Sequence, residues 1–249
     1  MHWARTTTLT LRLSDNVNLA WDPYLVTASV DWTNSLPIDT LIKLGARAPA
    51  TCSPTYGQVE VCDYAYGTNG WLGIASVWTQ YGHIVQDTVK LNDTYFASAS
   101  YNTPSWRRMV MCQEIGHTFG LNHQDETHTN INLGTCMDYT RDPSGLKGTN
   151  GTPNNEHPNA HDYDQLKSMY AHNDGWQLTA TRASSSAFSG NLFEGSKQAG
   201  NTPALAAAAP TALRELGRAV AFDGRGRGRV FKRILGGGVE LTTFITWAD

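Results

Sequence analysis

The sequence predicts an α+β fold in which strands come first, followed by a long helix, loops and a last helix. Apolar and polar residues alternate early in the chain, which indicates strands. Residues 102–120 carry the signals of a capped helix that a glycine ends. A second stretch, near residue 166, has apolar residues at helical spacing.

The first predicted elements are a strand and a helix. Leu9, Leu11 and Leu13 alternate with polar residues, as in a half-buried strand. Asp22 is placed to cap a helix, and Pro23 suits its first turn.

Residues 52–64 predict a hairpin, since Val59 and Val61 are separated by a polar residue. A bond between Cys52 and Cys62 could close it. Two more strands are expected within residues 70–93 on either side of a glycine-containing turn.

The stretch 102–120 predicts the longest helix. Asn102 or Thr103 would cap it, Pro104 suits its first turn, and Gly120 would end it. The residues expected to pack this helix against the sheet are Trp106, Met109 and Val110.

A last helix is expected around Leu166, Met169 and Tyr170, completing a domain over residues 1–175. Residues 176–225 are low in complexity and predict a flexible linker. Residues 226–249 predict a terminal β-hairpin. Its turn and the basic residues near it, interpreted as a solvated face rather than a contact for RNA, are Gly236, Gly237, Gly238, Arg225, Arg227, Arg229, Lys232 and Arg233.

Composition limits the classes of function. The chain has 249 residues, 40% of them hydrophobic and 16% charged, which suffices for a sizeable core. No stretch approaches the roughly 18 apolar residues of a membrane helix. A net charge of −3 favours neither nucleic acid nor an anionic membrane as a partner. We expect a monomer.

Four separate cysteines fit two disulfides, Cys52–Cys62 and Cys112–Cys136, in an oxidising compartment. The alternative is four buried thiols in a cytosolic protein. We expect a secreted protein, although the first residues do not form a signal peptide. The true N-terminus is then missing, or export is unconventional.

Residues 113–123 contain the candidate metal-binding and catalytic side chains. On a helix, Gln113 and His117 lie on one face, and Glu114 lies beside them. A turn at Gly120, which tolerates positive φ, can bring His123 back to the same point. Three ligands and a neighbouring carboxylate form the arrangement that a catalytic zinc requires.

Here the sequence resembles the metzincin zinc metallopeptidases, whose motif is H-E-x-x-H-x-x-G-x-x-H followed by a methionine turn. This chain has Q-E-I-G-H-T-F-G-L-N-H and then GTCMDYT. The resemblance covers roughly residues 5–172, and secreted bacterial proteins of this type share the core that contains the glutamine. It implies a twisted mixed sheet, a long active-site helix, a methionine turn and a C-terminal helix.

The resemblance also implies residue roles. His117 and His123 would bind zinc, Glu114 would be the general base, and Met137 would lie under the metal. Tyr139 would support the metal or the oxyanion. The edge strand that aligns a peptide substrate would include Gly73, Ile74 and Ala75.

Gln113 stands where the motif has a histidine, and three interpretations follow. Its Oε1 binds zinc, more weakly than an imidazole does. Another histidine replaces it, and the candidates are His128, His157 and His161. Alternatively, zinc is absent or inert, and the domain only binds peptides.

Other candidate sites carry less weight. Cys112 could bind zinc as a thiolate, but a disulfide is favoured because Cys112 lies about 100° around the helix from the metal face. A structural calcium is a further option, with Asp125, Glu126 and Asp138 as its ligands, although no calcium-loop pattern is present. Three histidines are interpreted as surface or strand-edge residues: His2, His83 and His172.

These observations predict a zinc-dependent endopeptidase that hydrolyses peptide bonds through a water activated by Glu114. The first alternative is a catalytically inactive relative that binds peptides or proteins. The second is an adhesion or structural module that uses the C-terminal hairpin.

Overall fold

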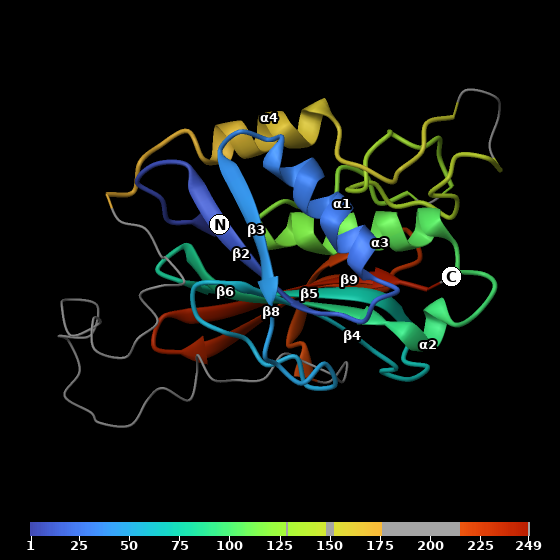
Figure 1. Cartoon of the computed structure of the whole chain (residues 1–249), viewed down its shortest axis with the longest axis horizontal. Coiled ribbons are helices and arrows are strands. Elements are labelled where there is room, and N and C mark those ends of the chain that lie inside the picture. Colours follow the sequence, from blue (N-terminus) through green and yellow to red (C-terminus); the bar gives the residue numbers. More distant parts are fainter. Residues whose placement is uncertain (128, 148–151, 176–214, 249) are drawn as a thin grey trace.

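The structure, a computed structural model, describes residues 1–127, 129–147, 152–175 and 215–248. These residues form a twisted mixed sheet with helices packed on one face (Figure 1), which confirms the predicted α+β class. The strands are β1 (His2–Trp3), β2 (Leu9–Asn16), β3 (Ile38–Leu44), β4 (Val59–Tyr64), β5 (Trp71–Gln80), β6 (His83–Asn92), β7 (Arg218–Phe222), β8 (Gly228–Gly236) and β9 (Val239–Trp247). The helices are α1 (Asp22–Thr33), α2 (Asp93–Phe96), α3 (Pro104–Thr118) and α4 (Ala160–Met169).

The sheet has the strand order β3-β2-β4-β6-β5-β9-β8-β7, and β1 also pairs with β6. The pairs among β1, β2, β3, β4 and β6 are parallel. All pairs from β5 onward are antiparallel. Helices α1 and α3 cover one face of the sheet, where α1 contacts β3 and α3 contacts β5 and β6.

Helix α3 lies across the centre of the molecule, between the sheet and α1 (Figure 1). Met109 and Val110 are buried in the main core, and Trp106 is nearly so, as their spacing predicted. The Thr103 side chain accepts a hydrogen bond from the Trp106 N–H and caps the helix. Asp22, by contrast, is not a cap: Trp21 takes that position, and Asp22 is the first helical residue of α1.

Both expected disulfides are present, Cys52–Cys62 and Cys112–Cys136. The hairpin expected over residues 52–64 is not. Only β4 forms there, and it pairs in parallel with β2 and β6 instead of with a strand of its own hairpin. Alternation identified the strand, but the sequence did not show its partners.

The C-terminal strands differ from the expectation of a separate hairpin. The turn between β8 and β9 is at the predicted glycines, but β9 pairs with β5 over most of its length and so joins the main sheet. Strand β7 lies within the range expected to be linker. The rest of that range, residues 176–214, lies outside the described residues. Strand β9 joins the sheet because β5 would otherwise have a free side, whose unpaired N–H and C=O groups can bond to another strand.

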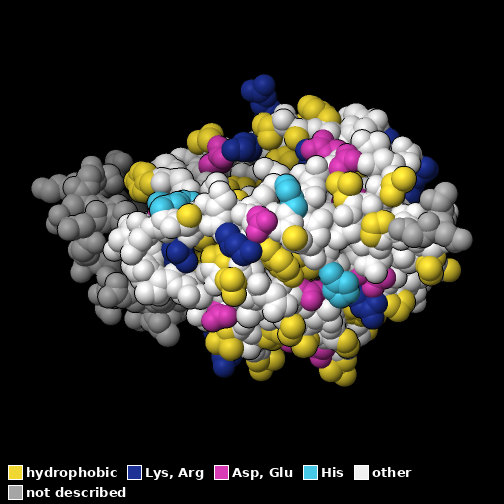
Figure 2. Space-filling view, turned by 90° about the horizontal axis from the view of Figure 1, so that it is seen from above, with side chains coloured by type: hydrophobic (Ala, Val, Ile, Leu, Met, Phe, Trp, Pro, Cys, Tyr) yellow, Lys and Arg dark blue, Asp and Glu magenta, His cyan; other side chains and the backbone are white. Residues whose placement is uncertain are grey.

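Within the described ranges, no helix is long and apolar enough to cross a membrane. On the face shown in Figure 2, acidic and basic side chains are scattered among uncharged ones and do not gather into a patch of one sign.

Candidate active site

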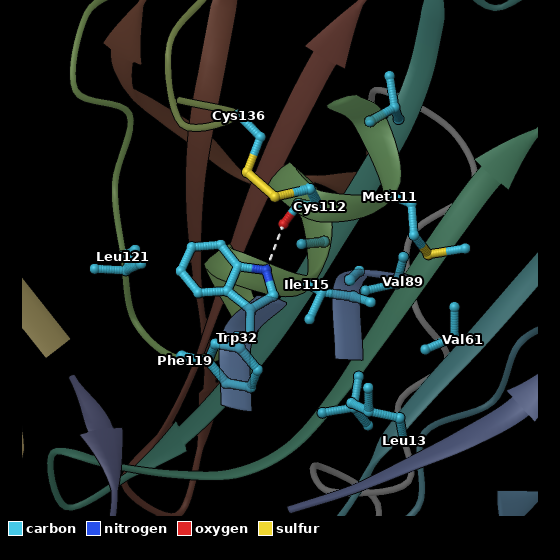
Figure 3. Packing of buried hydrophobic residues seen from close by; sticks show 14 of the residues in the cluster. Leu13, Trp32, Val61, Val89, Met111, Cys112, Ile115, Phe119, Leu121 and Cys136 are labelled. Carbon is cyan, nitrogen blue, oxygen red and sulfur yellow. Dashed lines mark hydrogen bonds between the residues drawn. A yellow bond between two sulfur atoms is a disulfide. The ribbon is translucent and has the colours of Figure 1, made fainter. Parts of the chain in front are cut away.

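Helix α3 is anchored to α1 and to the turn that contains Met137. Trp32 of α1 donates its indole N–H to the carbonyl of Cys112 at 3.0 Å, beside the Cys112–Cys136 disulfide (Figure 3). A Cβ on Gly116 would lie 2.6 Å from the Met137 sulfur, so Met137 packs directly against the helix at that glycine. The turn that contains Met137 is therefore fixed to α3 both covalently and by packing.

Gly120 turns the chain out of α3 with a φ of 97°, which confirms its expected role. The next residue, Leu121, accepts a hydrogen bond from His117 Nδ1 at 2.8 Å. His123 then returns toward the helix, and its ring lies 4.6 Å from that of His117, centroid to centroid. The sequence spacing thus brings the two predicted ligands together.

The Nε2 atoms of His117 and His123 lie 3.1 Å apart. Two nitrogens that bind one tetrahedral zinc at about 2.0–2.1 Å are separated by about 3.3 Å. Burial lowers the pKa of His117 to about 3 and holds the pKa of His123 well below its usual value, so both rings are neutral. In residue type, spacing and charge, this pair fits a zinc ion.

Gln113 lies on the same buried helix face, and both ends of its amide are engaged. Its Nε2 donates to the carbonyl of Cys136 at 2.8 Å, and its Oε1 lies within hydrogen-bond distance of the Thr246 hydroxyl. Oε1 keeps one lone pair beyond its Thr246 contact. Because the Cys136 carbonyl can only accept, the amide nitrogen lies on the Cys136 side and the oxygen lies on the Thr246 side.

Glu114 is fully buried against β5. Its Oε1 lies 2.6 Å from the Thr246 hydroxyl, which has one hydrogen and donates it either to this carboxylate or to Gln113 Oε1. A Cβ on Gly73 would lie only 2.5 Å from the same Glu114 oxygen. Burial raises the pKa of Glu114 to about 8, against the opposing effect of the Thr246 hydrogen bond. In this form of the protein the buried carboxyl therefore holds a proton at neutral pH, and it can act as a general base only after that proton is released.

Tyr139 borders His123 on its other side. Their rings make an edge contact with centroids 4.8 Å apart, and the Tyr139 hydroxyl donates to the carbonyl of Ile245 at 2.7 Å. The chain segments that carry them are also joined, because the Tyr139 N–H donates to the carbonyl of Asp125. Tyr139 therefore points a donor at a carbonyl of β9, beside the histidine pair.

The C-terminal strands cover this site. Phe244 of β9 stacks on His117 with ring centroids 4.2 Å apart, and Thr246 bonds to both Gln113 and Glu114. Strand β9 runs antiparallel to β5 and pairs Phe244 with Ala75. The expected edge strand with Gly73, Ile74 and Ala75 is thus not at an edge of this sheet, because β9 already pairs with it.

Arg229 of β8 sets the tautomer of His123. Its Nη1 lies 2.5 Å from His123 Nδ1, and its other amino group pairs with Glu126. Because a guanidinium only donates, His123 Nδ1 must accept, and the single ring proton is then on Nε2. That proton faces the lone pair of His117 Nε2. A zinc ion needs both Nε2 lone pairs, so zinc and the Arg229 contact exclude each other.

The remaining candidate ligands lie elsewhere. His157 Nδ1 lies 2.6 Å from Asp31, and His161 Nε2 lies 3.3 Å from Gln165 on α4. His128 is outside the described residues. The three residues considered for calcium have other partners: Asp125 and Asp138 accept hydrogen bonds from their own loop and from Asn155, and Glu126 pairs with Arg229.

Three residues at the site were not predicted: Arg229, Phe244 and Thr246. Arg229 is 5% exposed, which corrects its interpretation as part of a solvated basic face. A local signal was present, because Phe244 and Thr246 are two residues apart and so share one face of a strand. This alternation does not indicate which other residues that face contacts.

No protein-family model matches the chain, and no curated protein matches it either. Among solved structures, myroilysin is 14% identical over 69% of this chain and 83% of its own, with a TM-score of 0.39. High choriolytic enzyme 1, a hatching enzyme zinc-protease from Oryzias latipes, is 9% identical over 68% of this chain and 94% of its own, with a TM-score of 0.36. Likeness at this level assigns no family, and the function proposed below rests on the side chains.

Proposed function

We propose that this chain is a zinc-dependent endopeptidase of metzincin type that acts in an extracellular, oxidising compartment. The observation that carries the proposal is the pair of buried, neutral imidazoles whose Nε2 atoms face each other at 3.1 Å, with Glu114 on the same helix. The two disulfides support the compartment.

His117 and His123 would hold the zinc ion, and Gln113 Oε1 would be the third protein ligand. When bound, zinc lowers the pKa of water to about 7 and polarises a carbonyl. Glu114 takes a proton from the attacking water at its carboxylate and passes it to the nitrogen of the leaving amine. Tyr139 donates its hydroxyl hydrogen bond to the substrate carbonyl, as it does to the Ile245 carbonyl now.

Strand β5 would align the substrate. An extended peptide that pairs antiparallel with β5 presents its backbone to Gly73 and Ala75 and so to Glu114 behind them. Strand β9 occupies that position in the described chain. The peptidase form is therefore one in which β9 has left β5 and Arg229 has left His123.

The alternative is a peptide-binding protein without catalysis. One observation favours it: the nitrogen and the oxygen of the Gln113 amide both already have partners. In addition, an amide oxygen is a weaker zinc ligand than an imidazole. In that case β9 shows the binding mode, and zinc has no role.

The test measures zinc content after dialysis and then hydrolysis of an unstructured protein, with and without a chelator. We expect one zinc ion bound by His117 and His123, cleavage that the chelator abolishes, and loss of cleavage in Glu114→Gln. Glu240→Gln is the matched control, because Glu240 pairs with Lys232 at the surface of β8 and β9. Protein that binds peptides but cleaves none, and whose zinc content does not change in His117→Ala, would support the alternative.

A further inference from the structure

A second cluster of metal-binding side chains lies where the start of the chain meets the segment after α4. The Nε2 atoms of His2 and His172 lie 3.0 Å apart. Asp174 Oδ1 lies 3.2 Å from His2 Nε2 and 3.0 Å from His172 Nε2. His83 Nε2 is 4.0 Å from the same carboxylate oxygen.

The backbone brings these residues together independently of the side chains. His2 and His83 are register partners on the parallel strands β1 and β6. The Asp174 N–H donates to the carbonyl of Arg5, and the Arg5 N–H donates back to Asp174 Oδ2 at 3.0 Å. The second contact uses one carboxylate oxygen and leaves Oδ1 directed at the histidines. Residues 172–174 are thus tied to the N-terminal segment.

Hydrogen bonds alone cannot account for all the close contacts in this cluster. Three donor atoms lie 3.0–3.2 Å from one another, so there are three contacts. Two neutral imidazoles supply at most one N–H each toward the centre, which leaves one contact without a hydrogen. A cation at the centre would use a lone pair from each atom. Tetrahedral ligands at about 2.0–2.1 Å from zinc are about 3.3 Å apart, close to the observed separations.

The cluster is also partly shielded from water. The side chains of Asp174, His2 and His83 are 6%, 16% and 20% exposed, and only His172 is exposed by half.

We propose that His2, His172 and Asp174 bind a divalent transition-metal ion, with His83 as the fourth ligand. Imidazole nitrogens with one carboxylate select zinc or its neighbours in the first transition row over calcium or magnesium, which prefer oxygen. The ion would be structural, because four protein ligands close its coordination.

The position of the cluster indicates what the ion would stabilise. Trp3, the neighbour of His2, donates its indole N–H to the carbonyl of Thr118 at the end of α3. Its backbone N–H donates to the Tyr170 hydroxyl. An ion at His2 would therefore fix β1, the end of α3 and the segment after α4 to one another.

The experiment titrates the metal-free full chain with zinc alone against a chromophoric chelator and records its melting temperature. The variants are His172→Ala and Asp174→Asn. His161→Ala is the matched control, since His161 is also an exposed histidine near α4 but lies outside the cluster. We expect both cluster variants to lose one zinc equivalent and the zinc-induced rise in melting temperature. The control should retain both.

Counting equivalents separates this site from the one at His117 and His123. Wild type would bind two zinc ions if both sites exist and one if the proposed peptidase site is empty, and the cluster variants would bind one fewer in either case. Equal zinc content in wild type and His172→Ala overturns the proposal. So does an equal loss in His172→Ala and His161→Ala, which would indicate nonspecific binding by surface histidines. Circular dichroism of the metal-free variants checks their folding, and Asp174→Asn preserves the side-chain shape.

Discussion

Glu114 combines a carboxyl group with complete burial, and this combination has a measurable effect on stability. Its folded-state pKa is raised from 4.5 to about 8. The folded protein therefore keeps a proton that the unfolded chain releases between these two pH values. Stability contributed by this group is present below pH 4.5 and is lost as the pH rises toward 8. At pH 7 the loss is on the order of 3 kcal/mol.

We expect Glu114→Gln to remove this pH dependence. The amide is neutral at every pH and can still accept the Thr246 hydrogen bond. The free energy of unfolding, measured by urea titration at several pH values with a chelator present, should fall less steeply between pH 5 and 8 than in wild type. Glu240→Gln should keep the wild-type slope. A Glu114→Gln slope equal to that of wild type would show that Glu114 ionises freely in the folded protein.

Arg229 is expected to oppose metal binding. It donates to His123 Nδ1 and so places the ring proton on the nitrogen that zinc needs, and its charge repels a dication. Replacing it with Gln should raise zinc affinity at the histidine pair by about tenfold or more, the scale of effects from neighbours of metal ligands. The measurement is chelator competition with the full chain.

Arg225→Gln is the control for this change. It removes the same charge from an exposed position near the start of β8. Only the Arg229 variant should bind zinc more tightly. Equal affinities in wild type and Arg229→Gln would mean that Arg229 already leaves His123 in the unliganded chain.

At the scale of elements, the contact between α3 and β5 depends on Gly73. A Cβ there would lie 2.5 Å from Glu114 Oε1 and 2.7 Å from a methyl carbon of Val110. Gly73→Ala should therefore push α3 from the sheet or displace Glu114, at a cost of about 1–3 kcal/mol in unfolding free energy. Urea unfolding measures it. Gly224→Ala is the control, because the nearest atom to its Cβ would be 3.8 Å away. Equal stabilities of the two variants would show that β5 and α3 separate easily.

The elements also show what sequence could predict. Helix α3, its Thr103 cap and the turn at Gly120 follow from local signals, because capping and positive φ act within a few residues. The pairing of His117 with His123 follows too, since both lie on one short stretch. Strand partners do not follow: β4 was expected in a hairpin and instead pairs in parallel with two distant strands.

The same limit explains the missed residues at both sites. Thr246 lies 132 positions from Glu114, and Asp174 lies 172 from His2, so neither contact leaves a local pattern. Their positions depend on which strands and segments lie side by side, and this is decided by tertiary packing. His2 and His172 therefore looked like isolated surface residues.

For the whole molecule, the central question is whether β9 is a fixed part of the sheet or an occupant of the substrate position. It pairs with β5 in antiparallel register from Trp71 to Gln80, and Phe244 and Thr246 contact three of the proposed catalytic and metal-binding residues. A strand that blocks its own active site must be displaced before a peptide can bind. Activity should then depend on the effective concentration of β9, which is high while it is tethered.

Cutting the tether tests this. A protease site inserted between residues 176 and 214 would yield an N-terminal part and a part that carries β7, β8 and β9. We expect peptide hydrolysis per N-terminal part, at fixed zinc, to rise on dilution as the C-terminal part dissociates. It should fall again when the purified C-terminal part is added back. The uncut chain, diluted in parallel, should show constant activity. If cleavage stays constant at every dilution while size-exclusion chromatography shows that the two parts have separated, β9 is no obstacle to the substrate. If circular dichroism shows that the separated N-terminal part unfolds, β9 is instead an obligatory strand of this sheet.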